Sequence, residues 1–244
     1  MTAPALRVTG LQKRFGGVLA VDDVSLDLAE GELHAVIGPN GAGKTTLIHL
    51  LSGALRPSAG TIVLDGRAIT GLAMHRRVRL GLARSYQITS LFPNFTVLEN
   101  LALALQGAGR PDDQDHARVE LDAVGLGNRA DQLAGALAHG ERRQLELGLA
   151  LATGARILLL DEPMAGLGPE EAARITSLLE ALKRRRTILL VEHDMEAVFR
   201  LADRISTLVY GRVIASGVPD EIRRHPEVRR AYLGEAYWDG EGPA

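Results

Sequence analysis

The stretch Gly38-Pro39-Asn40-Gly41-Ala42-Gly43-Lys44-Thr45 decides the fold, because it satisfies the pattern G-x-x-x-x-G-K-[ST] between a strand and a helix. The apolar run Leu33–Ile37 before it predicts a buried strand, and Thr46–Leu51 after it predicts a helix. Backbone N–H groups of such a loop can surround phosphate oxygens at the positive end of the helix. A tight glycine turn is the alternative, but the Lys-Thr pair at this spacing favours binding of a nucleoside triphosphate.

Side chains at the end of this stretch have chemistry that suits a bound nucleotide. Lys44 can place its ammonium group against the β- and γ-phosphates, and the Thr45 hydroxyl can ligate Mg²⁺. Thr46 completes the predicted nucleotide-binding set of residues 38–46.

The composition of the 244-residue chain is that of an ordinary globular protein, with 46% hydrophobic and 24% charged residues. The formal net charge of −2 gives no electrostatic reason to expect a nucleic-acid partner. Cysteine is absent, which excludes disulfides, thiolate metal sites and thiol nucleophiles and fits a reducing cytosol. We expect neither a secretion signal at the N-terminus nor a membrane-spanning segment, so a membrane role would depend on a partner.

Apolar runs and turn residues predict one α/β domain built on a mostly parallel sheet that helices cover on both faces. The predicted strands are Leu6–Val8, Val24–Leu28, Leu33–Ile37, Thr61–Leu64, Ile157–Leu160, Thr187–Val191 and Ile205–Val209, and the later helices are Pro169–Leu182 and Met195–Leu201. Residues from about 91 to 151 show helical periodicity and predict an inserted helical subdomain. The nucleotide-binding core is expected at 1–90 and 152–233, with a frayed tail at 234–244.

Two adjacent carboxylates, Asp161 and Glu162, follow the predicted strand Ile157–Leu160. The C-terminal ends of parallel strands share one edge with the phosphate loop, so both carboxylates are expected beside the nucleotide. Asp161 is predicted to hold Mg²⁺ through water, and Glu162 to orient and polarise the attacking water. A solvated strand end that leads into a turn at Pro163 is the alternative interpretation.

His193 follows the predicted strand Thr187–Val191 at the same edge of the sheet. From there its imidazole could contact the γ-phosphate and hold the geometry of the water, with a structural histidine as the alternative. The other six histidines lack the spacing of metal ligands, so no zinc site is predicted.

A second glycine-containing helix entry occurs at Leu137-Ala138-His139-Gly140-Glu141-Arg142-Arg143-Gln144. One interpretation is purely structural: the segment is a loop that leads into a helix, and the negative charge of Glu141 stabilises the first turn of that helix. Such an entry is also a phosphate-recognition element. Since it lies far along the chain from the first loop, it suggests recognition of a nucleotide held by another subunit. Its candidate residues are Ala138, His139, Gly140 and Glu141.

The order of these motifs resembles that of the ATP-binding subunit of an ABC transporter. The phosphate loop, Gln87, the loop at 138–141, Asp161-Glu162 and His193 follow the family's order over essentially the whole chain. The resemblance implies a P-loop NTPase (RecA-like) core, an N-terminal antiparallel β subdomain and an inserted α-helical subdomain, with ATP and Mg²⁺ as cofactors. It also implies head-to-tail dimers that bind two ATP molecules. Each ATP lies between the phosphate loop of one subunit and the signature loop of the other, and residues 137–141 occupy the position of the signature loop in this chain.

Two further site residues come from this resemblance by position. Phe15, in Lys13-Arg14-Phe15-Gly16-Gly17, matches the aromatic residue that stacks on adenine, and an ordinary core phenylalanine is the alternative. Gln87, in Ser85-Tyr86-Gln87, matches the glutamine that touches Mg²⁺ and the attacking water and joins the core to the helical subdomain. The catalytic candidates are Glu162, His193 and Gln87, and the metal-ligand candidates are Thr45, Gln87 and Asp161.

The chain departs from the family at the signature loop and after Glu162. The family usually has Leu-Ser-Gly-Gly-Gln where this chain has Leu-Ala-His-Gly-Glu at 137–141, so Ala138 lacks the hydroxyl that meets the partner's γ-phosphate. Gly168 stands where the family usually has Asp, which puts communication across the dimer in doubt. These departures would fit a weaker ATP site paired with a stronger one on a different subunit. With Glu162 and His193 both present, hydrolysis is still expected.

Within the family, the chain resembles the ATPases of branched-chain amino-acid importers. The supporting segments are 91–100, 163–170 and 231–235. Urea- or amide-importing relatives and the ATPase of lipopolysaccharide export share much of them, and remain alternatives. We therefore expect an energy-coupling ATPase, peripheral at the cytoplasmic face of the inner membrane. Its expected partners are a second ATPase subunit in a homo- or heterodimer, transmembrane permease subunits and, indirectly, a solute-binding protein.

Other ATPase classes fit the sequence less well. A DNA-repair or chromosome-organising head would need long heptad arms, and a ribosome-acting factor would need two cassettes in one chain. A phosphoryl-transferring kinase is disfavoured by Glu162, His193 and the signature-like loop. We expect permease docking near Tyr86–Phe95, with burial of its apolar residues inside the subdomain as the alternative.

Overall fold

The computed structural model describes residues 3–85, 91–110 and 114–232. The strands are β1 (Leu6–Phe15), β2 (Val18–Leu28), β3 (Leu33–Ile37), β4 (Ala59–Leu64), β5 (Arg67–Ala68), β6 (Leu82–Arg84), β7 (Ile157–Asp161), β8 (Thr187–Val191), β9 (Arg204–Val209) and β10 (Arg212–Gly217). The α-helices are α1 (Lys44–Ser52), α2 (Met74–Arg79), α3 (Val97–Ala108), α4 (Gln114–Ala123), α5 (His139–Ala152), α6 (Pro169–Leu182), α7 (Met195–Leu201), α8 (Pro219–Arg224) and α9 (Pro226–Tyr232).

The central sheet has six strands in the order β10-β9-β3-β8-β7-β6. From β9 to β6 all neighbours pair in parallel, and β10 is antiparallel to β9. Every residue of β3, β7 and β8 is buried, as expected of strands whose sequences are mostly apolar. The predicted mostly parallel sheet is confirmed, and the C-terminal ends of β3, β7 and β8 bring the motif loops to one edge.

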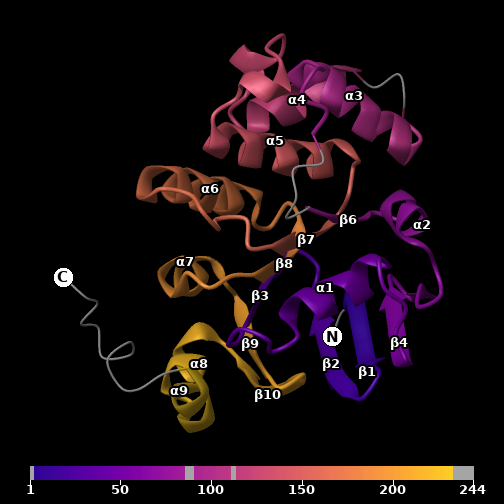
Figure 1. The fold of residues 1–244 in the computed structure, drawn as a ribbon, viewed down its shortest axis with the longest axis vertical. Helices are drawn as coiled ribbons and strands as arrows, with labels where there is room; N and C mark the ends of the chain where they lie inside the picture. The colour runs from indigo at the N-terminus through magenta and orange to yellow at the C-terminus, as the bar shows by residue number, and fades with distance from the viewer. Residues whose placement is uncertain (1–2, 86–90, 111–113, 233–244) are drawn as a thin grey trace.

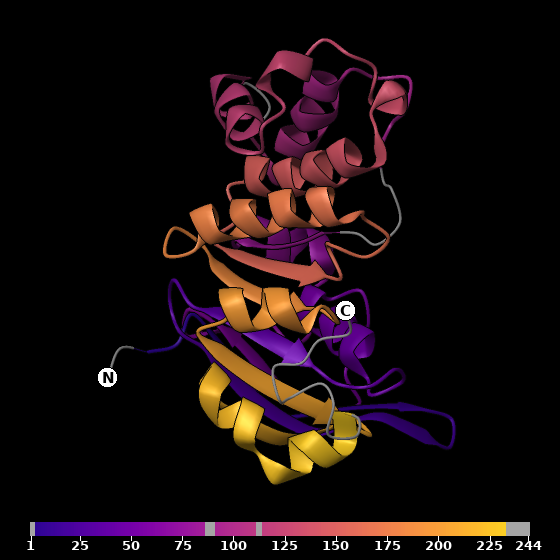
Figure 2. The same cartoon turned by 90° about the vertical axis from the view of Figure 1, so that its left-hand side faces the viewer.

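Both faces of this sheet are covered, and alternate residues of a strand enter different hydrophobic clusters. Ala35 and Ile37 of β3 pack in one cluster with Ile175 of α6 and Val198 of α7. Val36 enters the other cluster, which holds the buried residues of α1 and of the second sheet. Figure 2 shows α6 and α7 side by side across the near face of the sheet. The helices at Pro169–Leu182 and Met195–Leu201 begin and end where the sequence predicted.

The second sheet is antiparallel, in the order β2-β1-β4-β5. Its β1–β2 hairpin is longer than the strands predicted at Leu6–Val8 and Val24–Leu28, because β1 and β2 have 10 and 11 residues. Register shifts interrupt the pairing near Gly10 and Asp23, whose φ angles are 58° and 56°. These bulges break the two-residue alternation, so only the ends of the hairpin gave a strand signal.

The helices α3, α4 and α5 lie together at the end of the molecule beyond β6 and β7 (Figure 1). α3 begins with a capping box, since the Thr96 hydroxyl accepts the Glu99 N–H at 3.1 Å and the Glu99 carboxylate accepts the Thr96 N–H at 2.6 Å. α8 and α9 lie at the opposite end, beside β10. Within the three described ranges, no helix combines the length and apolarity that crossing a membrane would require.

Candidate functional site

The phosphate loop joins the buried strand β3 to the first turn of α1. A Cβ on Gly38 would overlap the carbonyl oxygen of Leu208, and a Cβ on Gly43 would overlap that of Ala20. Gly43 also has a φ of 104°, which a residue with a side chain rarely adopts. β2 and β9 therefore approach the loop so closely that only glycine fits at both positions. Between them, residues 39–41 are exposed at the tip of the loop.

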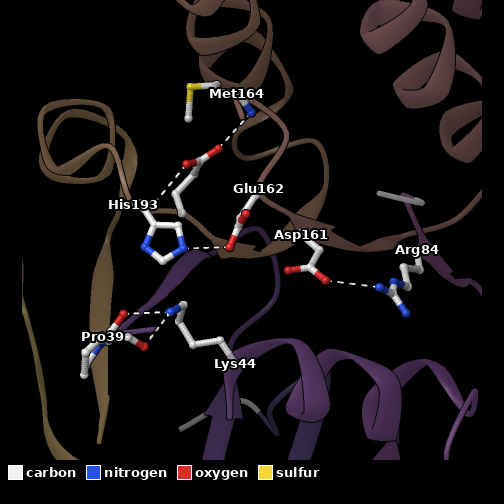
Figure 3. A network of polar contacts seen from close by, with 9 residues as sticks. Pro39, Lys44, Arg84, Asp161, Glu162, Met164 and His193 are labelled. Atoms are coloured by element: carbon white, nitrogen blue, oxygen red, sulfur yellow. Dashed lines mark hydrogen bonds and ion pairs between the residues drawn. The ribbon is translucent and has the colours of Figure 1, made fainter. Parts of the chain in front are cut away.

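Lys44 begins α1, and its side chain turns back over the loop (Figure 3). Its Nζ donates to the carbonyl oxygens of Gly38 at 2.7 Å and Pro39 at 3.0 Å. Burial lowers the pKa of the ammonium group, while the charges of Glu162 and Asp161 act in the opposite direction. The fold thus holds one buried cation between the loop and two carboxylates, as recognition of phosphate oxygens requires.

Asp161 ends β7 and is 1% exposed. Its Oδ2 accepts a hydrogen bond of 3.1 Å from a terminal nitrogen of Arg84, the last residue of β6. Its Oδ1 is buried and has no hydrogen-bond partner within the described part of the chain. Burial raises the pKa of this carboxyl, and the Arg84 guanidinium opposes the shift. Asp161 therefore has one oxygen occupied by an arginine and one left for another ligand.

Arg84 was not among the site residues predicted from the sequence. β6 has three residues, which is too short for a periodic pattern. The available signal was an arginine directly after the apolar pair Leu82-Ala83, in a strand that pairs in parallel with β7. Only the pairing of Arg84 with Leu159, two residues before Asp161, reveals that its side chain reaches the predicted metal ligand.

Glu162 and His193 form a hydrogen-bonded pair at the same edge. The Glu162 Oε1 lies 2.6 Å from the His193 Nε2, and their side chains are 23% and 41% exposed. Glu162 has a φ of 51°, uncommon for a residue with a side chain, and its N–H donates to the Val191 carbonyl at 2.8 Å. Such an outlier points to a functional constraint on the side chain it aims. The pair is open enough for a water molecule to reach the carboxylate.

Glu192, which was also not predicted as a site residue, holds the backbone on either side of this pair in place. Its buried carboxylate accepts the N–H of Met164 at 2.8 Å and the N–H of His193 at 2.9 Å. Burial raises the pKa of Glu192, and its bonds to backbone N–H groups act in the opposite direction. Because Met164 lies two residues after Glu162, Glu192 joins the two segments that carry the Glu162–His193 pair.

A magnesium ion suits the oxygen groups at this edge. Asp161 offers a buried carboxylate oxygen that has no hydrogen-bond partner among the described residues, and Thr45 offers a hydroxyl in the first turn of α1. Mg²⁺ is usually held by one or two carboxylates together with waters and substrate phosphates. In the described ranges, no cluster of three or more His, Cys, Asp or Glu side chains could hold a metal ion by itself. The donor set fits Mg²⁺ bound together with a nucleotide.

The signature-like loop at 138–141 lies at the start of α5, and its bonds join it to α6 and to the segment that precedes α5. The Gly140 N–H donates to a Glu171 carboxylate oxygen of α6 at 3.0 Å. The Glu141 carboxylate accepts the Ala138 N–H at 3.0 Å and pairs with Arg129 at 3.1 Å. These bonds involve neither the phosphate loop nor the Glu162–His193 pair, so the structure does not bring this loop to the site of its own chain.

Phe15 and Gln87 are the remaining predicted site residues, and the structure describes only Phe15. Phe15 ends β1, and it is 47% exposed. The Lys13 Nζ lies 5.1 Å from the centre of its ring. An exposed ring face is what stacking on a base requires. Gln87 lies outside the described residues.

Comparison with known proteins assigns the family. A family model described as ABC transporter matches residues 21–165, and one described as branched-chain amino acid ATP-binding cassette transporter matches residues 212–237. The chain is 42% identical to the high-affinity branched-chain amino acid transport ATP-binding protein LivG of Salmonella typhimurium, an alignment that covers 97% of this chain and 100% of that protein. The BraF protein of Pseudomonas aeruginosa, of the same description, is 40% identical over the same shares of both chains.

Solved structures agree with these relatives. The ADP conformation of an ATP-binding cassette from an ABC transporter superposes with a TM-score of 0.86 at 29% identity, covering 96% of this chain and 100% of that chain. A nucleotide-free cassette gives a TM-score of 0.86 at 30% identity, covering 95% and 100%. The P-loop NTPase fold and the resemblance identified from the sequence are both confirmed. The chain belongs to the ABC transporter family, as one of its ATP-binding, ATP-hydrolysing proteins.

Proposed function

We propose that this protein is the energy-coupling ATPase of an importer for branched-chain amino acids. The proteins LivG and BraF, which share about two fifths of its residues, are named for that transport. The match of residues 212–237 to a branched-chain amino acid transporter model supports the same solute class at the other end of the chain. The observation that carries the ATPase assignment is the Glu162–His193 pair beside the Asp161 carboxylate and the phosphate loop.

The residues of this edge divide the work of hydrolysis. Residues 38–46 bind the phosphates, and the Lys44 ammonium exchanges its bonds to loop carbonyls for bonds to phosphate oxygens. Thr45, Asp161 and Gln87 would hold Mg²⁺, which would neutralise charge on the phosphate oxygens. Glu162 orients the attacking water and accepts its proton, while His193 keeps the carboxylate in place through the 2.6 Å contact.

The second half of each ATP site is supplied by another ATPase subunit. Ala138, His139, Gly140 and Glu141 recognise the γ-phosphate of the nucleotide held by that subunit, and Phe15 stacks on the adenine of its own nucleotide. The contacts of the 138–141 loop support this arrangement, because they leave it on α5 and α6, apart from the phosphate loop of the same chain.

A cavity between the core and the helical region is the proposed docking site for a permease. It has a volume of about 360 Å³ and lies between α1, α2 and β6 on one side and α3 and α5 on the other. We call it the docking cavity. The residues that line it are Ser52, Met74, His75, Val78, Leu82, Ala83, Arg84, Phe92, Asn100, Leu103, Ala104, Gly107, Ala108, Glu146, Leu149, Ala150 and Thr153. Most of these side chains are apolar, which suits a short apolar segment of a membrane subunit.

Phe92 stands at this cavity as an exposed aromatic anchor. It is 54% exposed, and its ring stacks on Phe95 with centroids 5.4 Å apart. The Asn100 side chain accepts the Phe92 N–H at 2.9 Å and donates to the Phe92 carbonyl at 3.1 Å, which fixes the backbone below the ring. Docking here would hold the protein at the membrane through the permeases, at the cytoplasmic face.

Uptake of radiolabelled leucine, isoleucine and valine by cells that lack this chain tests the proposal. We expect uptake to fall, to return with the intact chain, and not to return with Glu162→Gln. Unchanged uptake of all three amino acids, with loss of urea or amide uptake or of lipopolysaccharide export instead, would contradict the proposed solute class. Loss of none of these would contradict the importer assignment.

A further inference from the structure

Arg84 takes part in both the predicted metal site and the docking cavity. Its guanidinium donates to Asp161 Oδ2 at 3.1 Å, and the same side chain lines the docking cavity. The pair is shielded from solvent, since the Arg84 and Asp161 side chains are 7% and 0% exposed. Arg84 therefore contacts the catalytic edge of the sheet through its guanidinium and also lines the surface that we propose for the permease.

The contact with Arg84 also sets the orientation of the Asp161 carboxylate. With Oδ2 turned toward the arginine, the other oxygen points toward the side of the site where Lys44 and Glu162 lie (Figure 3). That oxygen, Oδ1, is buried and without a hydrogen-bond partner among the described residues. Carboxylates that bind metals are commonly held by such a second contact, which fixes the direction in which they face the ion.

We propose that Arg84 is a positioning residue that aims Asp161 at the metal and couples metal binding to the docking cavity. The inference rests on the proposed function, because it takes Asp161 as a Mg²⁺ ligand and the cavity as the permease site. A guanidinium that moves when the cavity is filled changes the aim of Asp161. By the reciprocity of linked equilibria, metal binding at Asp161 must then change the environment of the cavity.

Arg143 provides a matched control for Arg84. It pairs with Glu146 at 2.9 Å, the two side chains are 15% and 7% exposed, and Glu146 lines the same cavity. Arg143→Gln thus removes a comparable buried pair on the cavity wall without touching Asp161.

The first measurement is calorimetric titration of the full-length protein with ADP over a range of Mg²⁺ concentrations. Mg²⁺ is expected to raise the affinity for ADP, and the Mg²⁺ concentration that gives half of this increase is the quantity compared. In Arg84→Gln we expect this concentration to rise about tenfold or more, the usual consequence of removing a group that orients a metal ligand. Affinity for ADP in EDTA should stay unchanged, and Arg143→Gln should behave as the unmodified protein. Arg84→Lys, which keeps the charge without the planar fork, serves if Arg84→Gln does not fold, and it should raise the same Mg²⁺ concentration.

The second measurement reads the cavity directly. The chain has no cysteine, so His75→Cys, at an exposed position of the cavity lining, gives a unique attachment point for an environment-sensitive fluorophore. With ADP present, addition of Mg²⁺ should change the emission, and Arg84→Gln should abolish the change while Arg143→Gln keeps it.

The outcomes separate the inference from the function on which it rests. If the unmodified protein does not bind ADP, the proposed function fails. If it binds ADP with a Mg²⁺ dependence that neither Arg84→Gln nor Arg84→Lys alters, the positioning role of Arg84 is wrong. A shifted Mg²⁺ dependence with an unaltered fluorescence response would overturn the coupling to the cavity.

Discussion

The phosphate-loop edge and the signature-like loop differ in how complete they are within one chain. At the edge, Lys44, Asp161 and the Glu162–His193 pair come from three different strand ends and lie together in one site. The loop at 138–141 has its partners elsewhere, through Glu171 on α6 and Arg129 in the segment before α5. One region is assembled by the fold of a single chain, whereas in the other the N–H groups of Ala138 and Gly140 donate to carboxylates of Glu141 and Glu171 and not to any group of the phosphate-loop edge.

The difference follows from what each region must do. Charged groups that position a phosphate and a water have to be held within a few tenths of an ångström, which buried strands in a parallel sheet provide. A loop that recognises a nucleotide on another subunit, as we propose for residues 138–141, has to remain apart until that subunit arrives. The comparison therefore predicts large losses from changes at the edge and small, association-dependent effects from changes in the loop.

Glu162→Gln should give the largest effect. Removing the base that orients the water should lower ATP turnover by roughly two to four orders of magnitude while ATP still binds, because the phosphate loop is untouched. Phosphate release by the assembled transporter measures turnover, and Glu180→Gln, an exposed partner of Arg200, is the control. Turnover close to normal in Glu162→Gln would remove Glu162 from the proposed role.

Lys44→Ala should weaken nucleotide binding itself. A charge-assisted bond contributes about 1.5–3 kcal/mol, so loss of contacts to two phosphates should lower ATP affinity by at least about 100-fold. Calorimetry measures the affinity, and circular dichroism checks that the variant is folded. Lys183→Ala is the matched control, since that lysine pairs with Asp203 at 3.0 Å, away from the phosphate loop. Equal ATP affinities in the two variants would contradict the phosphate-loop assignment.

Much of the assembled edge could be predicted from the sequence. The phosphate loop carries its own geometry in its glycines, and the apolar runs of β3, β7 and β8 place Asp161, Glu162 and His193 at common strand ends. These signals are local, because each motif follows its strand directly. The strand order then brings them together through the parallel pairing that buried apolar strands adopt.

The parts that the sequence did not predict depend on contacts between distant segments. Arg84 and Asp161 are 77 positions apart in the sequence. No pattern in the residues around either of them predicts that the two side chains are in contact. β10 (Arg212–Gly217) contains no fully buried residue, so it lacks the alternation of a half-buried strand. Glu192 was overlooked because its function is to accept backbone N–H groups, which any buried carboxylate could do.

Ala138→Ser should give the smallest effect and act only on association. The added hydroxyl restores one hydrogen bond to the opposing γ-phosphate, about 1–2 kcal/mol, or a fivefold to thirtyfold gain in ATP-driven dimerisation of a Glu162→Gln variant. With Ala138 the isolated protein should be largely monomeric and slow, because its membrane partners supply the effective concentration. Sedimentation with and without ATP measures this. A tight dimer already present with Ala138, and unimproved by Ser, would show that the missing hydroxyl does not limit closure.

The central claim is that the 138–141 loop completes an ATP site whose phosphate loop belongs to a second chain. A photo-crosslinking amino acid at His139, placed in the membrane-assembled transporter with Glu162→Gln, tests it most directly. On addition of ATP and illumination, we expect a cross-link from position 139 to the phosphate loop of a second ATPase chain, whether a copy of this protein or a different subunit. The cross-link should be absent without ATP. A cross-link that forms equally without ATP, or that joins position 139 only to residues of its own chain, would contradict the account.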